Sequence, residues 1–134
     1  MSYMLDTNTC ILAIKKNQNV FTKINEHLSD GLYISTIVLS ELEYGISHSK
    51  KSYQQKNRIA LIYFLAIIDI LDYGCDAALE YGILRDDLQK RKCVIGNMDM
   101  LIAGHAKAEN MVLVTHNTKE FSRVNGLIIE DWLL

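Results

Sequence analysis

The stretch from Val94 to Ala108 constrains the fold more than any other part of the chain. It reads VIGNMDMLIAGHAKA. Asn97 suits the N-cap of a helix, and nearly every residue after it is apolar. A helix that is apolar on almost all sides has to be buried, so other elements must cover it all round. Asp99 falls in the first turn of this helix, where a carboxylate is compatible with the positive helix N-terminus. Taken alone, Asp99 is best interpreted as a charge that satisfies the helix dipole.

The size and composition of the chain predict one globular domain spanning residues 1–134. Of its 134 residues 49% are hydrophobic and 22% are charged, which argues against disorder. The net charge of −2 does not indicate a generally basic nucleic-acid-binding protein, so a nucleic acid would have to meet local basic patches. Cys10, Cys75 and Cys93 show no C-x-x-C spacing, which predicts a reduced intracellular protein. We expect no signal peptide and no membrane span.

Strand patterns and helix patterns alternate along the chain. Apolar runs predict strands at 3–5, 32–35, 70–73, 111–115 and 127–129. Helical spacing of apolar residues predicts helices near 10–14, 19–28, 37–47 and from 76 onward, with Thr36 and Asp76 as N-caps. This alternation predicts a three-layer α/β/α domain with a central, mainly parallel sheet.

Polar residues directly follow two of the predicted strands. Asp6, Thr7 and Asn8 come after the first strand, and Asn117 and Glu120 follow the fourth. Each of Asp6, Thr7 and Asn8 could cap a helix, but one cap is enough. Open α/β sheets bind ligands at the carboxyl ends of their strands. The pattern therefore indicates a functional site at this edge of the sheet.

The predicted helix at 37–47 carries two glutamates, Glu41 and Glu43. Residues two apart do not share a helix face, so at most one of them points inward. Glu41 shares its side of the helix with apolar neighbours, whereas Glu43 is interpreted as part of a solvated face. If Asp6, Glu41 and Asp99 converge, they must share protons or bind a cation. A set of oxygen ligands suits Mg²⁺ or Mn²⁺, which could activate a water for attack on a phosphate.

Five segments of the chain together resemble one family, the VapC toxins with a PIN-domain ribonuclease fold. They are MLDTN at 4–8, ISTIVLSELEYG at 34–45, IGNMDMLIAGHA at 95–106, LVTHNTKEF at 113–121 and LIIEDW at 127–132. The resemblance covers essentially the whole chain and implies a metal-dependent endoribonuclease in which Asp6, Glu41 and Asp99 bind Mg²⁺ or Mn²⁺.

The resemblance also implies partners and a substrate. It predicts a homodimer in the bacterial cytoplasm, held inactive by a cognate VapB-type antitoxin. Some relatives cut the anticodon loop of initiator tRNA, and this makes tRNA cleavage, with translation inhibited as its result, the working hypothesis for the substrate.

Further residues receive supporting roles in this hypothesis. Thr7 and Asn8 would orient Asp6 and the scissile phosphate. The family often has Asp where this chain has Asn117, so fewer charges are present and one tightly held metal ion is favoured, with Glu120 as a possible contributor. The candidates for contacts with the RNA backbone are Lys50, Lys51, Lys90, Arg91 and Lys92.

Two alternatives and one unassigned segment stay open. A small phosphatase or phosphotransferase could use Asp6 as its nucleophile, but Asn8 occupies the position where that chemistry usually has a second Asp. An inactive PIN-like binding module would keep the acids only as helix caps. The ten-residue apolar run from Ile59 to Ile68 is either core or the interface with another chain.

Overall fold

A five-stranded sheet in the order β3-β2-β1-β4-β5 organises the computed structural model, which describes residues 1–134. All four strand pairs are parallel. The strands are β1 Tyr3–Leu5, β2 Leu32–Ser35, β3 Asp69–Leu71, β4 Val112–Val114 and β5 Ile129–Glu130. The helices are α1 Thr7–Ile14, α2 Gln18–Glu26, α3 Thr36–His48, α4 Lys51–Leu65, α5 Cys75–Lys90, α6 Asn97–Ala108 and α7 Thr118–Phe121, with a 3₁₀ turn at Leu28–Asp30.

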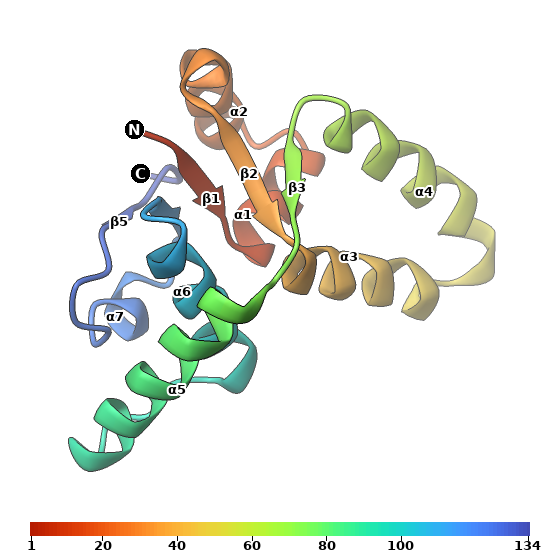
Figure 1. Ribbon diagram of the computed structural model, residues 1–134. Helices are drawn as coiled ribbons and strands as arrows, with labels where there is room; N and C mark the ends of the chain where they lie inside the picture. Colours follow the sequence, from red (N-terminus) through yellow and green to blue (C-terminus); the bar gives the residue numbers. More distant parts are fainter.

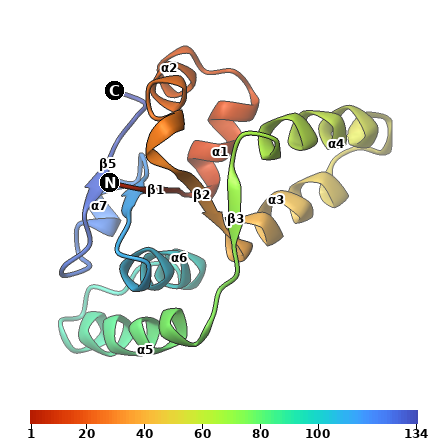
Figure 2. The ribbon, with the colours of Figure 1, turned by 45° about the horizontal axis from the view of Figure 1, so that its top comes forward.

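The helices lie on both sides of the sheet, as the alternating pattern predicts. Figures 1 and 2 show α5 and α6 together on one side and α1 and α2 on the other. Helices α3 and α4 form a hairpin that projects from the rest of the domain. The predicted three-layer α/β/α architecture with a parallel sheet is confirmed.

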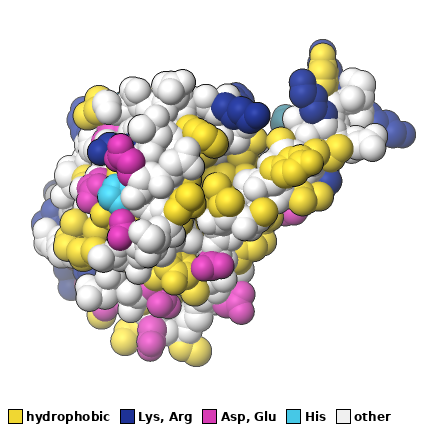
Figure 3. All heavy atoms as spheres, turned by 90° about the horizontal axis from the view of Figure 1, so that it is seen from above, with side chains coloured by type: hydrophobic (Ala, Val, Ile, Leu, Met, Phe, Trp, Pro, Cys, Tyr) yellow, Lys and Arg dark blue, Asp and Glu magenta, His cyan; other side chains and the backbone are white.

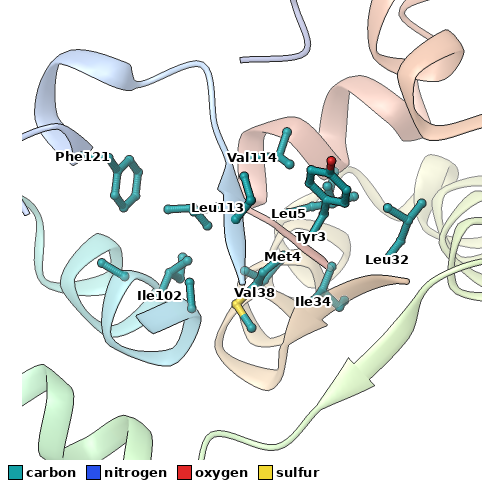
Figure 4. Packing of buried hydrophobic residues seen from close by; sticks show 14 of the residues in the cluster. Tyr3, Met4, Leu5, Leu32, Ile34, Val38, Ile102, Leu113, Val114 and Phe121 are labelled. Carbon is teal, nitrogen blue, oxygen red and sulfur yellow. The ribbon is translucent and has the colours of Figure 1, made fainter. Parts of the chain in front are cut away.

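The core is centred on β1 and β4, the two strands whose side chains are buried throughout. Met4, Leu5, Leu113 and Val114 have no exposed surface. Figure 4 shows them between Ile102, which comes from α6, and the side chains of neighbouring elements. A strand that is apolar at every position is typical of a parallel sheet covered on both faces. The polar residues that follow β1 and β4 are thereby held at the carboxyl edge of a rigid layer.

Helix α6 is buried, as its composition predicts, and it packs closely against α5. A Cβ atom added at Gly104 would lie 3.0 Å from the backbone nitrogen of Tyr81 and 3.2 Å from the carbonyl oxygen of Ala77. The two helix backbones therefore approach to a distance that only glycine allows at this position. This contact sets the depth at which α6, and Asp99 in its first turn, sits beside the sheet.

Three predicted N-caps are wrong, two of them by one residue. Ser35, not Thr36, caps α3, because the Ser35 hydroxyl accepts the backbone N–H of Ile37 at 3.0 Å. Gly96 precedes α6, so Asn97 is its first residue. Gly74, not Asp76, precedes α5. The strand and helix bounds otherwise differ from the predicted ones by a few residues, as at Tyr73, which lies beyond β3.

The apolar run at 59–68 lies mostly in α4 and is only partly covered. Leu61 and Phe64 are buried, whereas Ile59, Ile62 and Tyr63 are exposed. The space-filling view in Figure 3 shows yellow side chains along this arm and beside it. The run is therefore both core and uncovered surface.

None of the helices is both long enough and apolar enough to cross a membrane.

Candidate active site

Asp6 lies at the carboxyl end of the central strand and caps helix α1. Its Oδ1 accepts the backbone N–H of Thr9 at 2.9 Å, and the residue is only 4% exposed. The backbone N–H of Asp6 donates to the carbonyl oxygen of Val114 at 3.0 Å, and the Thr9 hydroxyl donates to the same oxygen at 3.2 Å. The junction between β1 and α1 is thus fastened to β4, and the Asp6 carboxylate has a fixed position.

Asp99 lies in the first turn of α6, and its pKa is raised from 3.8 to about 6. Burial is the largest cause, followed by the negative charges of Asp6, Glu120 and Glu41. The helix N-terminus favours the charged form of a carboxyl group and would lower the pKa of Asp99, whereas the three neighbouring carboxylates raise it. Asp99 is therefore more than a partner of the helix dipole. The interpretation of Asp99 from its own helix is therefore insufficient, because Asp6 at the cap of α1, Glu41 of α3 and Glu120 of α7 all act on it.

The two glutamates of α3 have different partners. The Thr7 hydroxyl, at the start of α1, donates a hydrogen bond to Oε1 of Glu41. Glu43 points to the other side of α3, where both of its carboxylate oxygens accept hydrogen bonds from Arg58 of α4 at 2.7 Å. Arg58 accordingly lowers the pKa of Glu43. Of the two, Glu41 is the one that faces the other acids.

The segment after β4 brings an amide and a carboxylate to the same edge. Nδ2 of Asn117 donates to Oε2 of Glu120 at 3.1 Å, and both side chains are partly buried. Glu120 is one of the charges that raise the pKa of Asp99. Asn117 therefore orients Glu120 toward the acidic group without adding a charge of its own.

The predicted supporting residues do not all take their expected places. Thr7 contacts Glu41, and the group that hydrogen-bonds Asp6 is the Thr9 amide, which the sequence analysis did not single out. The sequence does contain a signal for this hydrogen bond. An Asp at an N-cap accepts the backbone N–H of the residue two or three positions later, and Thr9 stands three residues after Asp6. Asn8 is exposed on α1.

The predicted basic residues fall into two groups. Lys50 and Lys51 lie at the turn of the α3–α4 hairpin and are exposed. Lys90 pairs with Asp86 at 2.8 Å, and Arg91 pairs with Asp87 at 2.6 Å. These two cations at the end of α5 are therefore largely neutralised by their own helix. Lys92 lies just beyond α5 and is exposed.

Two buried groups behind the acids are structural. Nδ1 of His105 lies 2.7 Å from the Ser35 hydroxyl, which joins α6 to the start of α3, and burial lowers the pKa of this imidazole. Since Ser35 accepts from Ile37 and donates to the neutral His105, the pair holds the helices that carry Asp99 and Glu41 together. Burial also raises the pKa of the Cys10 thiol well above its usual value, and the charge of Asp6 adds to this rise.

The donor set at this edge fits a hard divalent cation in its chemistry. It consists of carboxylate and amide oxygens with no histidine or cysteine, and its mutual repulsion is relieved by a cation. The side chains as they stand do not form a group of three acids, histidines or cysteines at ligand distance from one point. Asp6 and Glu41 each have one oxygen in a hydrogen bond, which leaves the other available to a ligand.

Comparisons with known proteins agree on one family. The PIN domain family model matches residues 3–127. The chain is 45% identical to Ribonuclease VapC2 of Rickettsia felis and 40% identical to the tRNA(fMet)-specific endonuclease VapC of Shigella flexneri, in each case over 98% of both chains. Its structure is similar to that of VapBC2 from Rickettsia felis bound to a DNA fragment from their promoter. The TM-score is 0.93, the identity is 42%, and 98% of this chain and 99% of that chain are covered.

Proposed function

The chain belongs to the VapC family of PIN-domain ribonucleases, the toxins of VapBC toxin–antitoxin systems, and on this basis we propose that it cleaves RNA at the Asp6–Asp99 edge of the sheet with a divalent metal ion. One observation carries the proposal. The pKa of Asp99 is raised to about 6, in part by Asp6, Glu120 and Glu41, so three carboxylates from other segments of the chain act on Asp99. Such repulsion is retained in a fold when the acids share a ligand.

Each residue of the site has a distinct role in this proposal. Asp6, Asp99 and Glu41, the last directly or through a water, would hold Mg²⁺ or Mn²⁺. When bound, the ion polarises the phosphate and makes a bound water more acidic. The Thr9 amide holds Asp6, the Thr7 hydroxyl holds Glu41, and Asn117 holds Glu120. The chain thereby keeps its acids in place before the substrate arrives, which lowers the cost of assembling the transition state.

Cleavage of total tRNA by the purified, antitoxin-free protein tests this function. We expect cleavage with Mg²⁺ or Mn²⁺, none with EDTA, and a loss of at least about 100-fold in Asp99→Asn. Asp76→Asn is the matched control, since Asp76 is also an acid in the first turn of a helix but is exposed on α5. No cleavage by well-folded protein would favour the inactive binding module, and cleavage that survives both EDTA and Asp99→Asn would reject this site.

The substrate we propose is tRNA, with initiator tRNA as the preferred one. This rests on the relative from Shigella flexneri, whose name specifies tRNA(fMet), and on its 40% identity to this chain. Cleavage of initiator tRNA in the bacterial cytoplasm would inhibit translation. Mapping the 5′ ends of the fragments identifies the target. Equal cutting of elongator and initiator tRNAs would reject the preference while leaving the ribonuclease in place.

We propose that a VapB-type antitoxin covers the apolar groove between α1, α2 and α4. The groove encloses about 360 Å³, and Ile14, Phe21, Ile59, Tyr63 and Ile67 are among its lining residues. The similar Rickettsia felis structure contains VapB together with VapC. Tyr63 is 74% exposed, so Tyr63→Asp should fold normally and weaken binding of the purified antitoxin by at least about tenfold. Unchanged affinity in isothermal titration calorimetry would place the antitoxin elsewhere.

A homodimer is the assembly we propose for the toxin without its antitoxin. Light scattering after size-exclusion chromatography measures its mass directly. A mass of one chain, 15.3 kDa, at micromolar concentration would reject the dimer.

A further inference from the structure

One face of α3 continues from the candidate active site to the tip of the α3–α4 hairpin. Glu41, Tyr44, Gly45 and His48 share this face, because residues three, four and seven apart lie on one side of a helix. Glu41 and His48 are seven residues apart, so the face extends for about 10 Å along the helix. Leu42 faces the core, and Glu43 faces α4 through Arg58. Beyond Glu41 the residues of this face, Tyr44, Gly45 and His48, are exposed, and at Gly45 the face borders a groove that Lys15 of α1 and Asn57 of α4 also line.

The face presents an aromatic surface to the solvent. The Tyr44 side chain is 66% exposed and its ring stacks on the imidazole of His48, with centroids 5.4 Å apart and an angle of 15° between the planes. Beside Tyr44 the helix carries no side chain at Gly45, where an added Cβ atom would meet nothing within 4 Å. Stacked aromatic planes beside an open strip are the form of surface on which nucleic-acid bases stack.

The charges at the far end of the face complement a phosphodiester chain. Lys50 and Lys51 follow His48 at the hairpin turn, and neither takes part in an ion pair. Glu43, the remaining acid of α3, is neutralised by Arg58 on the other side of the helix. Figure 3 shows dark blue lysine and arginine atoms gathered toward the end of the projecting arm. This end differs from the end of α5, where Lys90 and Arg91 are paired with acids.

We propose that this face of α3 is a stacking platform for single-stranded RNA leaving the active site. A base next to the scissile phosphate would stack on the Tyr44 ring, and Lys50 and Lys51 would contact the phosphates that follow. The inference rests on the proposed ribonuclease function and adds to it the path of the substrate. RNA is favoured over a protein partner because this surface combines an exposed aromatic ring with unpaired cations. The groove between α1, α2 and α4, which we assign to the antitoxin, is mainly apolar instead.

Binding of a fluorescein-labelled, 12-nucleotide single-stranded RNA, measured by fluorescence anisotropy in the Asp99→Asn background, tests the platform. We expect Tyr44→Ala to raise Kd by about tenfold or more, in keeping with the loss of one stacked base, and Tyr44→Phe to stay within about twofold. Tyr63→Ala removes a tyrosine of α4 that is 74% exposed, more than Tyr44, and should leave Kd unchanged. Equal Kd values for Tyr44→Ala and its background would overturn the proposal.

The salt dependence of binding separates stacking from charge. The double variant Lys50→Ala/Lys51→Ala should reduce the slope of log Kd against log salt by about 1 to 2, whereas Tyr44→Ala should leave the slope unchanged. With Asp99 restored, Tyr44→Ala should raise KM for tRNA with little change in kcat, the effect of losing binding that is uniform along the reaction. A change in kcat alone would overturn the platform.

Two outcomes separate this inference from the function on which it rests. Tyr44→Ala protein that cleaves and binds tRNA as wild type does would overturn the platform and leave the ribonuclease standing, whereas wild-type protein that neither binds nor cleaves RNA would overturn both. Light scattering measures whether Tyr44→Ala changes the oligomeric state of the protein. A dimer that becomes a monomer in Tyr44→Ala would assign the face to a second copy of the chain and overturn the RNA platform.

Discussion

The hydroxyl of Thr7 donates a hydrogen bond to Oε1 of Glu41, although the two residues are 34 positions apart in the chain. Thr7 is the first residue of α1 and follows Asp6 directly, whereas Glu41 lies in the middle of α3. The contact joins the start of α1 to the middle of α3, the helix that carries Glu41. It ties the position of Glu41 to that of Asp6, so a change at Thr7 should be felt at both carboxylates.

Thr7→Val should lower the rate of RNA cleavage by about tenfold, because Glu41 loses the hydrogen bond that orients it while the shape of the side chain is kept. Thr7→Ser retains the hydroxyl and should keep most of the activity. Initial rates on tRNA measure both variants, and circular dichroism checks their folding. Equal activity of the Val and Ser variants would show that the hydrogen bond has no part in catalysis.

Glu41→Gln and Glu43→Gln should separate catalysis from stability. Glu41→Gln should reduce cleavage by at least about tenfold, since a carboxylate charge near Asp99 is lost. Glu43→Gln should leave the cleavage rate within about twofold and lower the free energy of unfolding by about 0.5–1 kcal/mol, because its two hydrogen bonds to Arg58 are only partly buried. Urea denaturation and initial rates give the two quantities, and the reverse assignment would place Glu43 in the site.

The raised pKa of Asp99 should make the metal-free protein less stable as the pH rises. Between about pH 4 and pH 6 the folded state holds a proton that the unfolded state releases, so the free energy of unfolding falls with increasing pH over this range. Other groups titrate there too, so the relevant measurement is the difference between wild type and Asp99→Asn in EDTA. At pH 7.5 the variant should be the more stable by about 1–2 kcal/mol, after allowance for solvent screening.

Adding Mg²⁺ should reverse that order, because only the wild type gains stability from binding the ion. Thermal denaturation with and without Mg²⁺ measures both effects. A wild type that is already the more stable protein in EDTA at pH 7.5 would contradict the repulsion among these carboxylates.

Gly104→Ala should lower the free energy of unfolding by about 2–3 kcal/mol. The added methyl group would press on backbone atoms of Tyr81 and Ala77, which cannot move without separating α5 from α6. Gly82→Ala is the matched control within α5, because its added Cβ would meet nothing within 4 Å, and it should stabilise the protein by up to about 1 kcal/mol. If the two variants have equal stability in urea denaturation, the close helix contact is not a constraint on the fold.

Local patterns in the sequence were sufficient to predict the layers, the parallel sheet and the burial of the helix at 97–108. Strand and helix periodicity depends on residues that are near one another in the chain, and a buried β1 or α6 leaves little choice of neighbours. Asp6 could likewise be placed from its own segment, because it follows an apolar strand and precedes a helix. The prediction that Glu41, rather than Glu43, faces the acids came from the helical period and the family resemblance.

The tertiary structure alone decided which polar side chains meet. Thr36 and Asn97 are good caps, but Thr36 accepts the amide of Tyr73 and Asn97 accepts the hydroxyl of Tyr81, so neither caps its own helix. The sequence could not show this competition, because each partner comes from a distant segment. The same is true of Thr7 with Glu41 and of Ser35 with His105, 70 residues apart. Hydrogen bonds between elements depend on how closely those elements pack, and that distance is a property of the whole core.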